Sequence, residues 1–138
     1  MKALYVDTSA FVALTNKKDK NHGSARRLLR SLARSRRPLI TSTDVADEVI
    51  TLVRMRLGHP TAVEVGEAVF ESRWCRLLEV DNALRESAWR LFKRFDDQTF
   101  SFTDCTSFAL MQYLEVNEAF TFDRSDFGAA GFVALPRP

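Results

Sequence analysis

The chain has 138 residues, of which 46% are hydrophobic, and 20 Lys or Arg residues nearly balance 18 Asp or Glu residues. A chain of this length can bury one substantial core, so we expect a single domain over residues 1–138. The first apolar run breaks off at Asp7, and no run reaches the roughly 18 apolar residues of a membrane helix. We therefore expect a cytoplasmic protein without a signal peptide or membrane span.

Positive charge is concentrated in residues 17–37, which contain nine Lys or Arg and only one acid, Asp19. The rest of the chain is net negative. Such a segment attracts phosphate backbones, although a solvated helix face is the alternative explanation. The two cysteines, Cys75 and Cys105, have neither the neighbours of a zinc site nor the number needed for a disulfide framework, so we expect buried thiols.

The first predicted element is a buried strand over residues 3–6, and Asp7 stands at its carboxyl end. A short helix is expected at residues 10–14, followed by a polar loop over residues 16–23. Ser24 is expected to cap a second helix, whose apolar residues recur at helical spacing until an Arg-Arg-Pro stretch stops it.

The rest of the chain continues to alternate strands and helices. The expected elements are, in order, a strand over 39–41, a helix capped near Ser42, Thr43 or Asp44 and reaching about Leu57, a helix over 61–72, a strand over 75–80, a helix capped by Asp81, a loop over 96–102, a helix from Thr103 or Asp104 to Leu114, a strand over 119–122 that ends on Asp123, and a weak strand over 132–135. This alternation predicts an α/β fold with three α/β/α layers and a central parallel sheet of about four to five strands.

Four acidic residues occupy positions that this pattern brings toward one edge of the sheet. Asp7 and Asp123 each end a strand, while Glu48 and Asp104 fall on the inward, apolar faces of their helices. Each also has an ordinary explanation, since Asp is common at helix caps and turns and Glu48 can reach water. Their combination is more informative than any one of them.

Four carboxylates cannot share a small space in ionised form without a counter-charge. Oxygen ligands without a His or Cys cluster suit a hard divalent cation, Mg²⁺ or Mn²⁺, that also contacts phosphate. Such a site can activate water and offset charge on a phosphodiester, which is nuclease chemistry. Other phosphate chemistry lacks its signature here: Ser9 stands where an aspartyl-phosphate enzyme has a second Asp, and no dinucleotide or P-loop glycine motif occurs.

Four short motifs in order resemble the PIN domain, especially the VapC-like toxin ribonucleases, and the resemblance covers nearly the whole chain. The motifs are Val6-Asp7-Thr8-Ser9-Ala10-Phe11, Asp47-Glu48-Val49, Thr103-Asp104-Cys105-Thr106-Ser107-Phe108-Ala109, and Thr121-Phe122-Asp123-Arg124 with Asp126-Phe127.

The resemblance implies a metal-dependent endoribonuclease of a toxin–antitoxin pair, which cuts RNA in single-stranded loops, is inhibited by a small antitoxin and forms a homodimer. Asp7 and Asp104 would be direct metal ligands, Glu48 a ligand or the group that orients water, and Asp123 a ligand through water. The remaining implied site residues are Thr8, Ser9, Thr103 and Asp126 around the acids, and Lys17, Lys18, Lys20, Arg26, Arg27 and Arg30 for guiding RNA. The alternatives are a PIN-like binding module that does not cut, and a free-standing RNA-processing nuclease.

Overall fold

A computed structural model describes residues 1–138 as five strands and seven helices. In chain order the elements are β1 (Leu4–Val6), α1 (Thr8–Thr15), α2 (His22–Ser35), β2 (Leu39–Ser42), α3 (Thr43–Leu57), α4 (His59–Phe70), β3 (Arg76–Leu78), α5 (Asn82–Arg94), α6 (Phe102–Tyr113), β4 (Glu118–Phe120), α7 (Arg124–Ala129) and β5 (Val133–Leu135). No helix combines the length and the apolar character that a membrane span requires.

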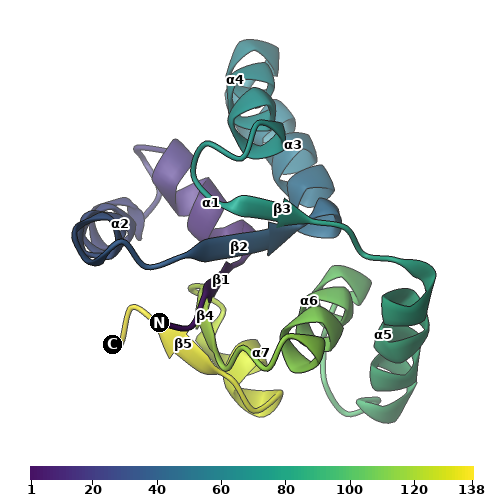
Figure 1. The fold of residues 1–138 in the computed structure, drawn as a ribbon. Coiled ribbons are helices and arrows are strands. Elements are labelled where there is room, and N and C mark those ends of the chain that lie inside the picture. The colour runs from purple at the N-terminus through teal and green to yellow at the C-terminus, as the bar shows by residue number, and fades with distance from the viewer.

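The five strands form one parallel sheet in the order β3-β2-β1-β4-β5. Figure 1 shows α1 to α4 on one side of this sheet and α5 to α7 on the other. Both faces of the sheet are therefore covered, as parallel sheets require. The predicted three-layer α/β/α architecture with four to five parallel strands is confirmed.

The central strand β1 places the first acid of the chain. Val6 pairs with Phe120 of β4, and the backbone N–H of Asp7 donates to the Phe120 carbonyl at 3.0 Å. The carboxyl ends of β1 and β4 consequently lie side by side. In a parallel α/β sheet this edge is where loops converge over a rigid support.

The core lies on both sides of β1 and includes a buried cluster of three hydrogen-bonded hydroxyl groups. The buried Tyr5 hydroxyl contacts Ser42 Oγ at 3.1 Å and Ser107 Oγ at 2.7 Å, and its burial raises the Tyr5 pKa. Phe108 packs edge-on against Phe127 with ring centroids 5.0 Å apart. These contacts join β1 to the end of β2, where Ser42 caps α3, and to α6, and they join α6 to α7. The predicted burial of both thiols is also confirmed.

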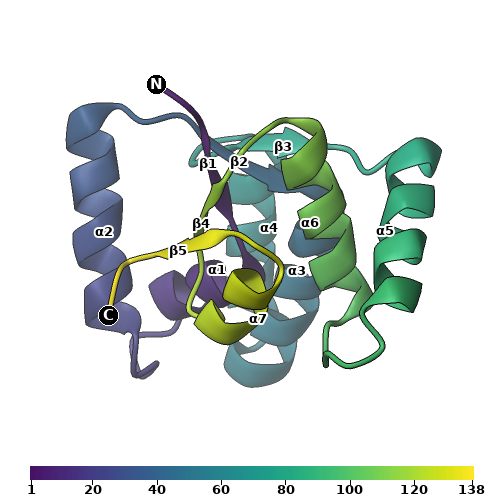
Figure 2. The same cartoon turned by 90° about the horizontal axis from the view of Figure 1, so that it is seen from below.

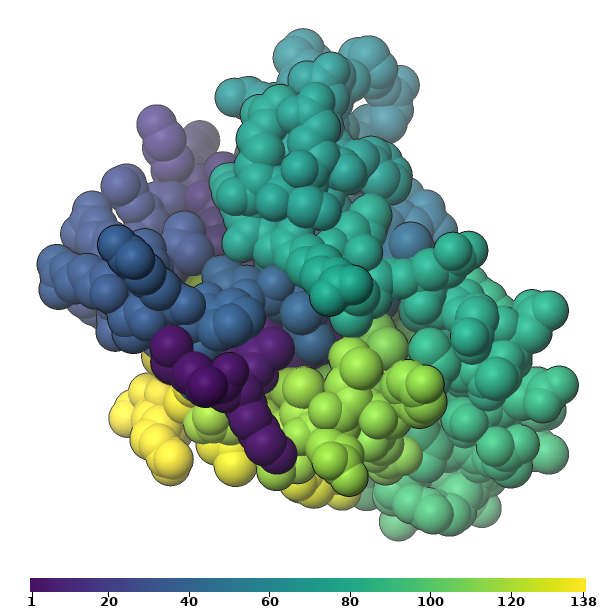
Figure 3. All heavy atoms as spheres, in the orientation of Figure 1, coloured from purple at the N-terminus to yellow at the C-terminus, as the bar shows by residue number.

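Helix α5 packs along α6 and lies on the outer side of it, away from the sheet (Figure 2). Its N-terminus is as predicted, because Asp81 Oδ1 accepts the Leu84 N–H at 2.9 Å. The N-terminal segment lies at the surface between the blue and green segments in Figure 3. There the Lys2 carbonyl accepts from Arg37 Nε, and Lys2 Nζ donates to the Glu115 carbonyl.

Four predicted helix starts are wrong by a few residues. Helix α1 begins at Thr8 and not at residue 10. Helix α2 begins at His22 rather than after Ser24, and the His22 ring contacts the Ala13 carbonyl at 2.7 Å. Helix α4 begins at His59, because Pro60 fits a first turn and does not stop a helix there. Helix α6 begins at Phe102, one or two residues earlier than predicted.

The C-terminal part differs most from the prediction. Strand β4 ends at Phe120 and not at residue 122, so Asp123 stands three residues beyond the strand. Asp123 instead precedes a helix that was not predicted, α7, and its carbonyl accepts the Phe127 N–H at 3.1 Å. This short helix brings Asp126 to the same edge as Asp123.

Candidate functional site

An open pocket of about 250 Å³ lies at the carboxyl ends of β1 and β4. All four acids that the sequence placed at this edge line it: Asp7, Glu48, Asp104 and Asp123. They come from the end of β1, from α3, from the start of α6 and from the loop before α7. The fold thus brings together side chains that are separated by up to 116 positions in the chain.

Hydroxyl groups hold the Asp7 carboxylate. Thr121 Oγ1 donates to Asp7 Oδ2 at 2.8 Å, and Ser9 Oγ donates to the same oxygen at 3.0 Å. The Ser9 oxygen also accepts the Phe122 N–H at 2.9 Å, and the Thr121 oxygen accepts the Asp123 N–H at 3.0 Å. Because each hydroxyl has one proton and directs it at Asp7, the network fits an ionised carboxylate.

Asp7 is only 5% exposed, and this burial raises the pKa of its carboxyl. The hydrogen bonds from Thr121 and Ser9 act in the opposite direction and favour the charged form. Burial of a charged carboxylate is costly unless a positive charge compensates it. The site therefore favours a cation in front of Asp7.

Asp104 caps its own helix and also faces the pocket. Its Oδ2 accepts the Ser101 N–H at 3.0 Å, and Ser101 Oγ accepts the Asp104 N–H at 3.0 Å, which is a capping box. Burial raises the pKa of Asp104 to about 6, and the charges of Asp7 and Asp126 add to the rise. One carboxylate oxygen thus completes the cap while the acid stays in the cluster.

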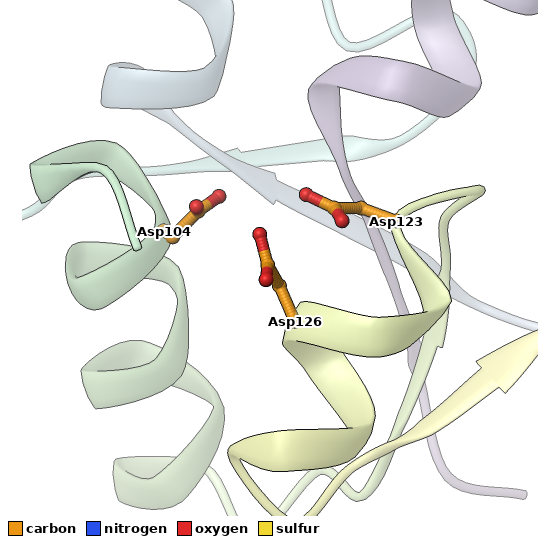
Figure 4. Close-up of side chains that lie close together, drawn as sticks. All are labelled: Asp104, Asp123 and Asp126. Carbon is orange, nitrogen blue, oxygen red and sulfur yellow. The ribbon is translucent and has the colours of Figure 1, made fainter. Parts of the chain in front are cut away.

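Three carboxylates converge beside the pocket. Oxygens of Asp104, Asp123 and Asp126 lie within 4.8 Å of one another, and Figure 4 shows the three side chains pointing together from α6 and from the start of α7. The pKa of Asp123 is raised to about 7. Burial is the largest cause of this rise, and interactions with Asp126, Asp104 and Asp7 add to it.

No Lys or Arg forms an ion pair with these acids, since the three ion pairs of the structure join Arg37 to Glu118, Arg73 to Glu71 and Arg85 to Asp44. Repulsion among clustered carboxylates without a basic partner is relieved either by a shared proton, which their raised pKa values favour, or by a bound cation. Oxygen ligands of this kind suit a hard divalent cation. The residues present therefore fit a metal ion.

The acids predicted for the site divide into those that line the pocket, those that belong to the group of three close carboxylates, and those that do both. Asp7 and Glu48 line the pocket but are not in the group whose oxygens lie within 4.8 Å, whereas Asp126 is in that group. Ser9 contacts Asp7 as described. Thr8 Oγ1 is buried without a hydrogen-bond partner, and the Thr103 side chain makes no hydrogen bond.

The predicted basic residues lie on two elements at the surface. Lys17, Lys18 and Lys20 are exposed in the loop between α1 and α2, whose Asp19 and Asn21 line the pocket. The exposed Arg26, Arg27 and Arg30 lie on α2 and do not line it. None of the six basic residues lines the pocket, but the three lysines lie in the loop that contributes Asp19 and Asn21 to its lining.

Six residues of the site were missed by sequence reasoning: Thr121, and the pocket-lining Val12, Asp19, Asn21, Leu52 and Arg56. Thr121 donates the shorter hydrogen bond to Asp7, and Arg56 lines the pocket eight residues after Glu48. The signal for Arg56 was available, because positions 48, 52 and 56 share one helix face. No local pattern marks Thr121, since its partner is 114 residues away.

A protein family, a related sequence and a related crystal structure all match almost the whole chain. The PIN domain family matches residues 4–133. The 23S rRNA-specific endonuclease VapC20 of Mycobacterium tuberculosis is 41% identical over 133 residues, which cover 96% of this chain and 97% of the relative. The crystal structure of M. tuberculosis VapC20, described as a sarcin-ricin loop cleaving toxin, superposes with a TM-score of 0.85 at 40% identity and covers 94% of this chain and 96% of that one.

Two more distant structures share the fold. VapBC2 from Rickettsia felis, bound to a DNA fragment from its promoter, matches with a TM-score of 0.72 at 12% identity, over 96% of this chain and 97% of that one. FitAcB from Neisseria gonorrhoeae matches with a TM-score of 0.68 at 17% identity, over 95% of each chain. With a family match over almost the whole length and a relative 41% identical, the chain belongs to the PIN-domain family.

Proposed function

We propose that the chain is a metal-dependent endoribonuclease of the VapC toxin type and that the acid pocket is its active site. The observation that carries this proposal is the convergence of Asp104, Asp123 and Asp126 beside a pocket that Asp7 also lines. The 41% identity to an endonuclease supports it. Mg²⁺ or Mn²⁺ is the proposed cofactor, since both prefer carboxylate oxygens.

We infer that Asp104, Asp123 and Asp126 hold the cation with Asp7 beside them. A divalent cation at such a site makes water more acidic and offsets negative charge on the phosphate that is cut. Asp7 is kept ionised and oriented by its two hydroxyl donors. Glu48 reaches the pocket from the rigid wall of α3, where its carboxylate can hydrogen-bond to the attacking water and accept a proton.

The proposed substrate is a single-stranded loop of structured RNA. The related VapC20 acts on 23S rRNA and cleaves the sarcin-ricin loop, so a loop of large-subunit ribosomal RNA is the first substrate to test. The exposed Lys17, Lys18 and Lys20 offer positive charge beside the acids, which would otherwise repel phosphates. We place this activity in the cytoplasm, where RNA is present and free thiols stay reduced.

A small antitoxin is the proposed protein partner, and a homodimer the proposed assembly. Exposed apolar side chains on α3 and α4 offer surface to an amphipathic helix of such a partner: Met55 is 77%, Val63 44% and Phe70 62% exposed. An apolar helix face laid into a groove is a common way for a short chain to bind. Copurification with the product of a neighbouring small gene would test this part.

Cleavage of a synthetic sarcin-ricin hairpin tests the enzymatic proposal. We expect Mg²⁺- or Mn²⁺-dependent cutting in the loop, with no cutting in EDTA and no cutting of a fully paired RNA duplex. Asp104→Asn should remove the activity, whereas Asp97→Asn, which alters an exposed acid outside the pocket, should retain it. Equal cleavage by both variants would refute the assignment of the site, and an inert wild-type protein on varied RNAs would indicate a binding module instead.

A further inference from the structure

One wall of the acid pocket is a single face of helix α3. Glu48, Leu52 and Arg56 follow one another at four-residue spacing, and all three line the pocket. Eight residues of α-helix extend about 12 Å. Along this distance the wall changes from a carboxylate, through an apolar side chain, to a positive charge.

Arg56 carries a positive charge that no acid of the protein neutralises. It is exposed in the last turn of α3 and takes part in none of the three ion pairs. Asp19 also lines the pocket, and its carboxylate accepts the Asn21 N–H at 2.8 Å. A cation in the last turn also complements the helix dipole, but Arg54 already supplies one there.

We propose that Arg56 binds a phosphate of the RNA next to the phosphate that is cut. Leu52 would then pack against the nucleoside that joins these two phosphates. This inference rests on the proposed function and adds a binding position to the same site. The planar guanidinium matches phosphate oxygens with paired hydrogen bonds. Because phosphate contacts position a strand without reading its bases, Arg56 sets where the strand lies and not which sequence is chosen.

RNA binding by a protein that cannot cut provides the test. In the Asp104→Asn background with Mg²⁺, fluorescence anisotropy would measure the affinity for a labelled sarcin-ricin hairpin at several salt concentrations. Adding Arg56→Ala should weaken binding about tenfold and reduce the salt slope by about 0.7, the value for one phosphate contact on a single strand. Arg56→Lys should keep the salt slope, because it keeps the charge.

Arg54→Ala is the matched control, since Arg54 is also exposed in the last turn of α3 but lines a different groove, beside Val63 and Phe70. It should change binding less than twofold. Equal loss with Arg54→Ala, or no loss with Arg56→Ala, would overturn the inference and leave the proposed function intact. In the otherwise wild-type, active protein, Arg56→Ala should raise KM and leave kcat and the Mg²⁺ requirement unchanged. A changed Mg²⁺ requirement with unchanged RNA binding would instead make Arg56 a partner of the acids and overturn the inference. Failure of the wild-type protein to cut would count against the proposed function alone.

Discussion

Replacing Asp104 by Asn should stabilise the metal-free protein while it removes activity. A pKa raised from 3.8 to about 6 corresponds to a charge penalty of about 3 kcal/mol at neutral pH, at about 1.4 kcal/mol for each pH unit. Asp104 is only partly buried, and solvent screening reduces the expected gain to about 1–2 kcal/mol. The Asn oxygen can still accept the Ser101 N–H, so the helix cap is kept.

The pH dependence of the stability gain shows whether the raised pKa of Asp104 is its cause. The folded protein binds the Asp104 proton more tightly than the unfolded chain does, so this contribution to stability is greatest at low pH. It is lost as the pH rises from about 4 to about 6. The advantage of Asp104→Asn should therefore be full at pH 8 and absent near pH 4.

Urea denaturation in EDTA at these two pH values measures the effect. We expect Asp104→Asn to raise the free energy of unfolding at pH 8, and Asp97→Asn, in an exposed loop, to leave it unchanged. Asp104→Ala should lose about 1 kcal/mol relative to Asn, because it removes one half of the capping box and leaves the Ser101 N–H without its acceptor. An Asn variant that is less stable than the wild-type protein at pH 8, or equally stabilised at both pH values, would refute the reasoning.

Three further predictions concern the metal, the hydroxyl network and the core. Mg²⁺ should raise the melting temperature at pH 8 more than at pH 5.5, because protons compete for carboxylates whose pKa values are about 6 and about 7; equal shifts in differential scanning fluorimetry would contradict this. Thr121→Val should lower cleavage of the hairpin about 10- to 100-fold by releasing Asp7, and Asp7→Asn should abolish it; a wild-type rate in Thr121→Val would show that its hydroxyl is not needed, and one in Asp7→Asn that the Asp7 carboxylate is not needed. Phe108→Ala, in the centre of the aromatic core, should cost about 3–5 kcal/mol in urea unfolding; a loss under 1 kcal/mol would mean that the core is less tightly packed there.

Much of the fold followed from local pattern. The apolar run before Asp7 predicted β1, because a strand in the middle of a sheet is buried on both faces. The apolar residues at helical spacing between Ser42 and Leu57 predicted α3, because one face of that helix packs on the sheet. The start of α6 could also have been found. Ser101 and Asp104 have the spacing of a capping box, so the true cap lies one turn before the acid.

Other features depend on tertiary contacts and could not be predicted locally. Helix α7 has six residues, too few for an apolar stripe, and Phe127 packing on Phe108 gives it a place in the core. Without this helix, Asp126 had no defined position beside Asp123. The role of Thr121 likewise appears only after β1 and β4 have paired.

The pairing of β1 with β4 also affects when the protein becomes competent during synthesis. Asp7 precedes Thr121 by 114 residues, so it obtains its hydrogen bond from Thr121 only after those residues have been translated. Asp123 and Asp126 emerge later still, on the short helix that β4 precedes. A nascent chain that stops before β4 therefore holds Asp7, Glu48 and Asp104 but lacks Asp123 and Asp126. The ribosome that makes it is not exposed to an assembled cutting centre until β4 and α7 have been made.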